Sequence, residues 1–215
     1  MKVIPAINCK DFKCVKEQIK KAVEFLPKNE WIQIDVGDGK FTKAKAWGEA
    51  QQLRDLRFEI KALNNLNIEA HLMVENPEEQ IEKWARMGAG RVIIHAEAVN
   101  SENFKKIILK FKNKIGIAIN PKTPIENLVP YLDKIKFVQL LAVKPGFSGQ
   151  KFDKIILDKI KFLKENYPKI LVEIDGGINE ETVKLVKKAG ADMVVSGSYI
   201  FKSKNPKEAY KKLSV

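Results

Sequence analysis

The sequence predicts an α/β protein whose eight parallel strands close into a (β/α)8 barrel, the TIM-barrel architecture, as a single domain over residues 1–215. Three observations predict this fold. Eight short apolar runs alternate strictly with helical patterns, and successive runs begin roughly 20 to 40 residues apart, the size of one βα unit. No linker or change of composition divides the 215 residues, a length at the short end for such barrels.

The expected strands are runs rich in Val, Ile, Leu or Phe, a composition typical of strands buried on both faces. In chain order they cover residues 3–8, 31–36, 68–74, 91–96, 115–120, 137–143, 170–175 and 193–198. An open, doubly wound sheet would show the same alternation of strands and helices. Eight units and the lack of an early GxGxxG motif favour the closed barrel.

The expected helices occupy the intervals between these runs. Asn76 precedes Pro77 and two acidic residues, which is typical of a helix N-terminus. Two further helices begin after Ser101 and Asn179, and Gly190 ends the second of these. The remaining helices are expected near residues 11–25, 50–64, 124–135, 153–167 and 205–213.

The chain is strongly basic, with 39 Lys and Arg against 27 Asp and Glu and a formal net charge of +12. Most of this charge is lysine, interleaved with acidic residues along expected helix faces, as between Lys154 and Lys164. Arginine, which base readout and phosphate clamps favour, is confined to positions 54, 57, 86 and 91. We therefore expect a solvated outer surface and no nucleic-acid partner.

Other features of the chain indicate a cytoplasmic protein. No apolar run approaches the roughly 18 residues of a membrane helix, and no secretory pattern opens the sequence, so no membrane partner is expected. Cys9 and Cys14 lack the spacing of a metal site, and we expect them to be a reduced thiol pair. His95 and the tryptophans are interpreted as packing residues.

Polar side chains at the carboxyl ends of the strands mark the expected active site, because barrel enzymes place their chemistry there. Gln33 and Asp35 lie two residues apart and so share the inward face of one strand. Asp175 ends a strand nearly opposite, and His71 approaches from a third strand. Such a group would hold a divalent metal or move protons on the two faces of a flat intermediate. The alternative is that both carboxylates merely cap strand ends.

Glycine-rich loops after the last three strands form a second candidate cluster. Backbone N–H groups in such loops make a nest for anions, and barrels often bind phosphate after the seventh and eighth strands. The alternative is that these glycines only form turns. The residues concerned are Gly146, Phe147, Ser148, Gly149, Gly176, Gly177, Gly197 and Ser198.

Across its whole length the sequence resembles the ribulose-phosphate 3-epimerase family. The resemblance rests on stretches that occur in order: WIQIDVGDGKF (31–41), EAHLMVENP (69–77), AINPKTP (118–124), VKPGFSGQKF (143–152), VEIDGGIN (172–179) and VSGSYIF (195–201). HLMVENP, PGFxGQKF and DGGIN together are specific, whereas any one alone would be weak.

The resemblance implies an isomerase of carbohydrate metabolism that inverts the carbon next to the ketone of a ketose phosphate, D-ribulose 5-phosphate or a close analogue. Asp35 and Asp175 are then the acid/base pair, one removing the proton and the other returning it to the opposite face of an enediolate. A divalent ion (Zn, Fe, Mn or Mg) is implied at Gln33, Asp35, His71 and Asp175. The substrate is implied to contact His71, Asp175 and the glycine loops named above, and the protein to form a homo-oligomer.

The chain departs from the family's usual residues at several positions near the implied site. Gln33 stands where the family has His, which favours harder ions than Zn²⁺ or lowers metal affinity. The other departures are Ala6 for Ser, Gly37 for Met, Lys40 for His, Lys144 for Asn, Ser148 for Gly, and Leu141-Ala142 for a Met-Ser pair. Lys40 and Lys144 add positive charge near the expected mouth.

Two other functions remain open from the sequence. Lys144 ends a strand at a place where some barrel aldolases carry a Schiff-base lysine, which would make the protein a lyase. Loss of metal through Gln33 would instead leave a catalytically impaired, phosphosugar-binding barrel.

Overall fold

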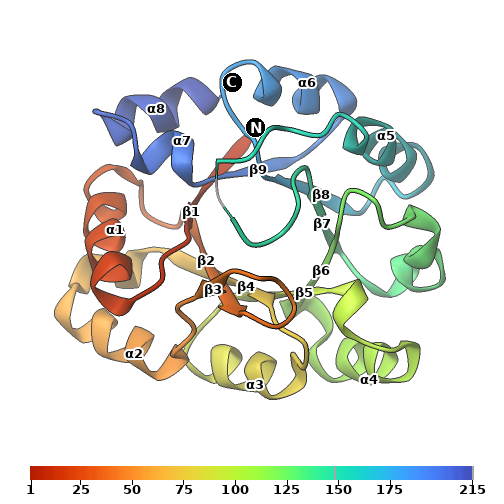
Figure 1. Cartoon of the computed structure of the whole chain (residues 1–215), viewed down its shortest axis with the longest axis horizontal. Coiled ribbons are helices and arrows are strands. Elements are labelled where there is room, and N and C mark those ends of the chain that lie inside the picture. Colours follow the sequence, from red (N-terminus) through yellow and green to blue (C-terminus); the bar gives the residue numbers. More distant parts are fainter. Residues whose placement is uncertain (148, 215) are drawn as a thin grey trace.

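The computed structural model describes residues 1–147 and 149–214 and confirms the closed barrel of eight parallel strands (Figure 1). The barrel strands are β1 (Lys2–Ile7), β2 (Trp31–Asp38), β4 (Asn67–Met73), β5 (Arg91–His95), β6 (Ile115–Ile119), β7 (Phe137–Leu141), β8 (Leu171–Asp175) and β9 (Met193–Ser196). Strand β1 pairs with both β9 and β2, and this double pairing closes the ring. A short extra strand, β3 (Lys45–Ala46), pairs antiparallel with the end of β2.

Helices surround the barrel as an outer ring (Figure 1). They are α1 (Phe12–Phe25), α2 (Ala50–Glu59), α3 (Glu78–Arg86), α4 (Ser101–Phe111), α5 (Ile156–Asn166), α6 (Thr182–Ala189), α7 (Ser198–Phe201) and α8 (Pro206–Leu213). Each longer helix buries one apolar stripe, as Ile81 and Trp84 do in α3, against outward-facing strand residues. Among the described residues, no helix has the length and apolarity that a bilayer crossing requires.

The prediction of a helix over residues 124–135 is wrong, because this segment forms two short 3₁₀ turns instead. They are η4 (Ile125–Asn127) and η5 (Val129–Lys134). Pro130 explains the difference, since proline has no N–H to donate and its ring clashes with the carbonyl four residues earlier in an α-helix. Three further 3₁₀ turns are η1 (Lys61–Asn65), η2 (Ala96–Ala98) and η3 (Lys112–Lys114).

The inside of the barrel is filled by alternate strand residues and is apolar only in part. Its apolar members are Ile4, Ala6, Ile93, Ala118, Phe137, Leu141, Met193 and Val195. Glu69, Gln139 and Glu173 are fully buried polar residues of the same interior, and Gln139 pairs in register with Glu173. Arg91 on β5 lies beside the two glutamates, with its Nη1 atom 2.9 Å from Glu69 Oε2 and 3.7 Å from Glu173 Oε2. A layer of buried charge therefore lies below the carboxyl ends of the strands.

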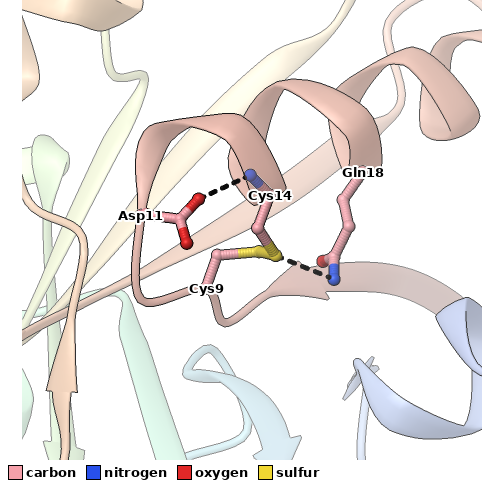
Figure 2. The surroundings of a disulfide bond; sticks show 4 residues. All are labelled: Cys9, Asp11, Cys14 and Gln18. Atoms are coloured by element: carbon pink, nitrogen blue, oxygen red, sulfur yellow. Dashed lines mark hydrogen bonds between the residues drawn. A yellow bond between two sulfur atoms is a disulfide. The ribbon is translucent and has the colours of Figure 1, made fainter.

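The expectation of two reduced thiols is wrong, because Cys9 and Cys14 are joined in a disulfide (Figure 2). Cys9 follows β1, and Cys14 lies in the first turn of α1, where Asp11 accepts a hydrogen bond from its backbone N–H at 2.9 Å. This cap turns the chain so that the two Cα atoms are 5.7 Å apart, within the span that a disulfide requires. The sequence spacing alone does not reveal that turn.

Candidate active site

A pocket of about 390 Å³ opens at the carboxyl ends of the strands. Its walls come from the ends of β2, β4, β7, β8 and β9 and from the loops that follow them. The described residues between β7 and α5 curl across this end of the barrel (Figure 1). The polar side chains of its floor are Asp35, His71 and Asp175.

The strand register brings these three residues together. Asp35 on β2 lies opposite His71 on the neighbouring strand β4, and their Oδ1 and Nδ1 atoms are 3.3 Å apart. Asp175 ends β8 and places its Oδ2 atom 3.5 Å from the same His71 Nδ1. Gln33 lies one inward position below Asp35, and its Nε2 donates to Asp35 Oδ1 at 2.7 Å and to Asp175 Oδ2 at 3.1 Å. The residues that sequence reasoning grouped are therefore in mutual contact.

Burial and charge shift the proton affinities of this group. Burial alone would lower the pKa of His71, but hydrogen bonds to Asp175 and Asp35 outweigh it and raise the pKa to about 10. Burial raises the pKa of Asp175, and its contact with His71 opposes that rise. The two neighbouring carboxyl groups thus favour the protonated form of His71.

His95 is a partner of this site that sequence reasoning interpreted only as packing. It is fully buried, and its Nε2 lies 2.9 Å from His71 Nε2. Burial, helped by the charge of His71, lowers the pKa of His95 to about 4, so the neutral ring accepts from His71 and turns its Nδ1 toward Glu97 Oε2 at 3.4 Å. The signal that could have found His95 is its place on β5, the strand beside that of His71.

Asn8 is a second residue that the site prediction missed. Its Nδ2 donates to Asp35 Oδ2 at 2.9 Å and to the Gly146 carbonyl at 3.3 Å. It directly follows β1, so its position at a strand end was the available signal. Asn8 thus ties the Asp35 carboxylate to the loop that follows β7.

The group fits a divalent ion at three corners. One ligand atom from each of Asp35, His71 and Asp175 lies within 4.8 Å of the others. Bonds of about 2.1 Å in a tetrahedral site separate the ligands by about 3.4 Å, close to the 3.3 and 3.5 Å measured from His71 Nδ1. At the fourth ligand position lies the Nε2 atom of Gln33, 3.4 Å from His71 Nδ1. The oxygen of Gln33 faces Gln139 instead. Gln33 would serve as a ligand only with its amide turned over.

The glycine-rich loops surround the same pocket. Its lining includes Gly146, Phe147, Gly149, Gly176, Gly177, Gly197 and Ser198, whereas Ser148 lies outside the described residues. At Gly177, with φ of 66°, a Cβ atom would lie 2.8 Å from the Phe152 backbone, so this turn requires glycine. Ser198 begins α7, and the first N–H groups of a helix have no acceptor within it. The N-terminus of α7 therefore borders the pocket.

The two lysines expected near the mouth do not line the described part of the pocket. Lys40 and Lys144 are exposed and are not among the described residues that line the pocket, whereas Lys202, at the end of α7, does line it. A Schiff-base lysine needs a desolvated amine, and exposed Lys144 has no such environment. The lyase alternative therefore gains no support from the geometry.

A (β/α)8 barrel that gathers two carboxylates and an imidazole on the floor of a pocket has the arrangement of an enzyme of proton-transfer or metal-assisted chemistry. Residues 2–201 match the model of the ribulose-phosphate 3 epimerase family, and the chain belongs to that family. This agrees with the resemblance inferred from the sequence motifs.

Individual relatives agree with the family match. Ribulose-phosphate 3-epimerases of Schizosaccharomyces pombe and Bacillus subtilis are 31% and 33% identical to this chain. The alignments cover 96% and 97% of this chain and 90% and 96% of those relatives. Among solved structures, 3-hexulose-6-phosphate synthase from Salmonella typhimurium superimposes with a TM-score of 0.74 at 15% identity, covering 100% of this chain and 97% of that one. At that identity the likeness concerns the fold alone.

Proposed function

We propose that this protein interconverts the two C3 epimers of a ketopentose phosphate, D-ribulose 5-phosphate and D-xylulose 5-phosphate or a close analogue. The observation that carries the proposal is the meeting of Asp35 and Asp175 beside His71, in a chain of the ribulose-phosphate 3 epimerase family. Epimerisation next to a ketone needs one group to remove a proton and another to return a proton to the opposite face. Two carboxylates that enter from β2 and β8 meet that need.

Asp35 and Asp175 exchange roles with the direction of the reaction. In one direction, the first carboxylate removes the proton and the second protonates the intermediate. In the reverse direction, the second carboxylate removes the proton and the first protonates the intermediate. Hydrogen bonds from Asn8 and Gln33 hold the Asp35 carboxylate in place, and Gln33 also holds Asp175. The two groups therefore need little rearrangement before the proton moves.

We further propose that Asp35, His71 and Asp175 hold a divalent ion, with Gln33 as a potential fourth ligand through its oxygen. When bound, the ion supplies positive charge beside the oxygens on which negative charge develops during proton removal. Carboxylates and an amide oxygen favour Mn²⁺ or Mg²⁺ over Zn²⁺. Asp35 and Asp175 both line the pocket, so a substrate in the pocket lies against the two carboxylates.

The phosphate of the substrate is proposed to bind on the other side of the pocket. Gly176 and Gly177 follow β8, and Gly197 and Ser198 follow β9, so their backbone N–H groups approach one region. Barrel enzymes commonly bind phosphate at the loops after their seventh and eighth strands. Lys202 adds a positive charge at that side.

The test is conversion of D-ribulose 5-phosphate in deuterated water, with the protein stripped by a chelator and then supplied with Mn²⁺, Mg²⁺, Zn²⁺ or Fe²⁺. We expect inversion at C3 with incorporation of solvent deuterium. Absence of both inversion and exchange with every ion would refute the epimerase. Tight binding of the sugar phosphate without turnover would instead indicate the impaired, binding-only barrel.

Cytoplasmic location and a homo-oligomeric state are also proposals. Both rest on the family, one of whose members is a cytoplasmic isoform from Oryza sativa that is 32% identical to this chain. Light scattering after gel filtration measures the oligomeric state, and fractionation of the source cells measures the location.

A further inference from the structure

Gln139 lies inside the barrel, one layer below the pocket, and is not among the described residues that line it. It is fully buried on β7, in register with Glu173 on β8. Its Nε2 donates two hydrogen bonds, to Gln33 Oε1 at 2.7 Å and to Glu173 Oε1 at 2.9 Å. Gln139 therefore connects the buried charge layer to the floor of the site.

A side-chain amide presents an oxygen on one side and a donor nitrogen on the other. Because Gln139 donates to the oxygen of Gln33, the nitrogen of Gln33 must face the site. There it meets Asp35 Oδ1, Asp175 Oδ2 and His71 Nδ1, which are the three candidate metal ligands. The corner that a fourth ligand would occupy is thus filled by a hydrogen-bond donor.

The reverse orientation of Gln33 is opposed by the same neighbours. If Gln33 turned its oxygen toward the ligands, its nitrogen would face the nitrogen of Gln139, donor against donor. If Gln139 turned as well, its oxygen would face Glu173 Oε1, and the hydrogen bond from Gln139 Nε2 to that atom would be lost. The buried Oε1 of Gln139 has no hydrogen-bond partner among the described residues, so its orientation is set by the two acceptors that face its nitrogen.

We propose that Gln139 is a positioning residue that holds the Gln33 amide with its nitrogen on the catalytic carboxylates and thereby weakens divalent-ion binding at Asp35, His71 and Asp175. Gln139 reaches the site through its hydrogen bond to Gln33 Oε1. The inference rests on the proposed function only in taking these three residues as the metal site.

The first experiment replaces Gln139→Met, which has nearly the same length but no donor. Gln33 then loses the bond that fixes its oxygen, and its amide is free to turn toward an ion. Calorimetric titration of the chelator-treated protein with Mn²⁺ should show binding tighter by about tenfold, the value of one buried hydrogen bond. Unchanged or weaker Mn²⁺ binding by a variant that melts like the parent would overturn the proposal.

A matched background separates the role of Gln139 from a general effect of the substitution. In the variant Gln33→His, an imidazole replaces the amide at the fourth ligand position, so there is no amide for Gln139 to orient. Adding Gln139→Met to this variant should therefore leave the affinity for Mn²⁺ unchanged within twofold. An equal gain in both backgrounds would show that Gln139 does not act through Gln33. Gln139→Leu, a second donor-free variant, must reproduce the gain, and failure to do so contradicts the proposal.

A measurement on the unmutated protein covers the case in which these variants do not fold. With ¹⁵N-labelled glutamine, titration with Mg²⁺ should shift the side-chain amide signals of both Gln33 and Gln139. A response from Gln33 alone, or from neither amide at saturating Mg²⁺, would overturn the proposal. None of these readouts uses a sugar phosphate, so a protein that binds ions as expected but does not epimerise would refute the proposed function and leave this inference standing.

Discussion

At the scale of single residues, the candidate site depends on which atom each polar side chain turns inward. Asp35 and Asp175 reach the same His71 nitrogen from strands that are not neighbours in the barrel. The sequence predicted this meeting because period-two alternation fixes the inward face of a strand. It did not predict the orientation of the Gln33 amide, because that depends on a residue 106 positions away.

The first prediction concerns the two carboxylates. Asp35→Asn or Asp175→Asn should reduce epimerisation by a factor of about 100 to 10,000, since each removes one proton-transferring group but keeps the size of the side chain. Each variant should still exchange substrate hydrogen with deuterated water from one epimer, through the remaining carboxylate. Mass spectrometry of recovered substrate measures this exchange.

Asp133→Asn is the control for these variants, because Asp133 is exposed and lies away from the pocket lining. Its turnover should equal that of the parent. Retention of full inversion in either active-site variant would mean that Asp35 and Asp175 are not the acid/base pair.

The second prediction concerns His95. His95→Phe keeps a ring beside Phe41, whose centroid is 4.7 Å away, but removes the acceptor for His71 Nε2. Loss of a partner that orients a metal ligand typically costs 10- to 100-fold in metal affinity or activity, and we expect that loss here. Titration with Mn²⁺ and steady-state kinetics measure it. His95→Gln, which can still accept from His71, should recover much of the loss, and equal defects in both variants would assign His95 to packing only.

At the scale of elements, the strands were predictable and one helix was not. Each barrel strand is a short apolar run with a turn on either side, so its pattern and its burial agree. Residues 124–135 show helical spacing, yet Pro130 limits them to 3₁₀ turns. The missing helix does not affect the prediction of the candidate site, because the acidic and histidine residues of the site come from strand ends.

The third prediction concerns the disulfide that joins the end of β1 to α1. Reduction should lower the free energy of unfolding by about 2 kcal/mol, the chain-entropy value for a short closed loop. Thermal melts with and without a thiol reductant measure this difference. A variant with both Cys9→Ser and Cys14→Ser should have the melting temperature of the reduced parent, and the reductant should not change it. A parent protein that is indifferent to reductant would contradict the prediction.

The fourth prediction concerns the loop after β6. Lys159 on α5 donates from Nζ to the backbone carbonyls of Asn120, Pro121 and Thr123. Lys159→Met keeps the aliphatic stem and removes these charge-assisted bonds, so the free energy of unfolding should fall by about 2 kcal/mol. Urea titration measures the change. Lys161→Met on the same helix is the control, because Lys161 is exposed, pairs with the exposed Asp158, and should have almost no effect on stability.

At the scale of the whole molecule, most lysines and the buried carboxyl groups lie on opposite sides of the strands. The net charge of +12 comes largely from lysines on the helical ring, whereas the barrel interior holds carboxyl groups. The fold and the outer surface followed from patterns that single sequences show well. Period two places Glu69 on the face of His71 and Glu173 on the face of Asp175. The contacts of Gln139 with Glu173 and of Arg91 with Glu69 could not be predicted, because they run between strands of the closed barrel.

The fifth prediction follows from this buried layer and concerns the stability of the whole chain. Burial raises the pKa of Glu173 to about 7 and that of Glu69 well above its usual value, although Arg91 lies beside both. The native state therefore keeps protons that the unfolded state releases above about pH 4.5, so this contribution to stability falls as pH rises from about 4.5 to 7. Each such group changes the free energy of unfolding by at most about 1.4 kcal/mol per pH unit.

Comparison with Glu173→Gln tests this effect, because the variant removes the titration of Glu173 together with its influence on the pKa of Glu69. Glutamine keeps an oxygen that can accept from Gln139 Nε2, and Arg91 keeps its closer partner, Glu69. Urea titrations between pH 5 and 8 in the presence of a chelator should show the variant gaining stability relative to the parent as pH rises toward 7. A stability difference that stays constant over this range would mean that Glu173 is ionised throughout, and that Arg91 fully offsets its burial.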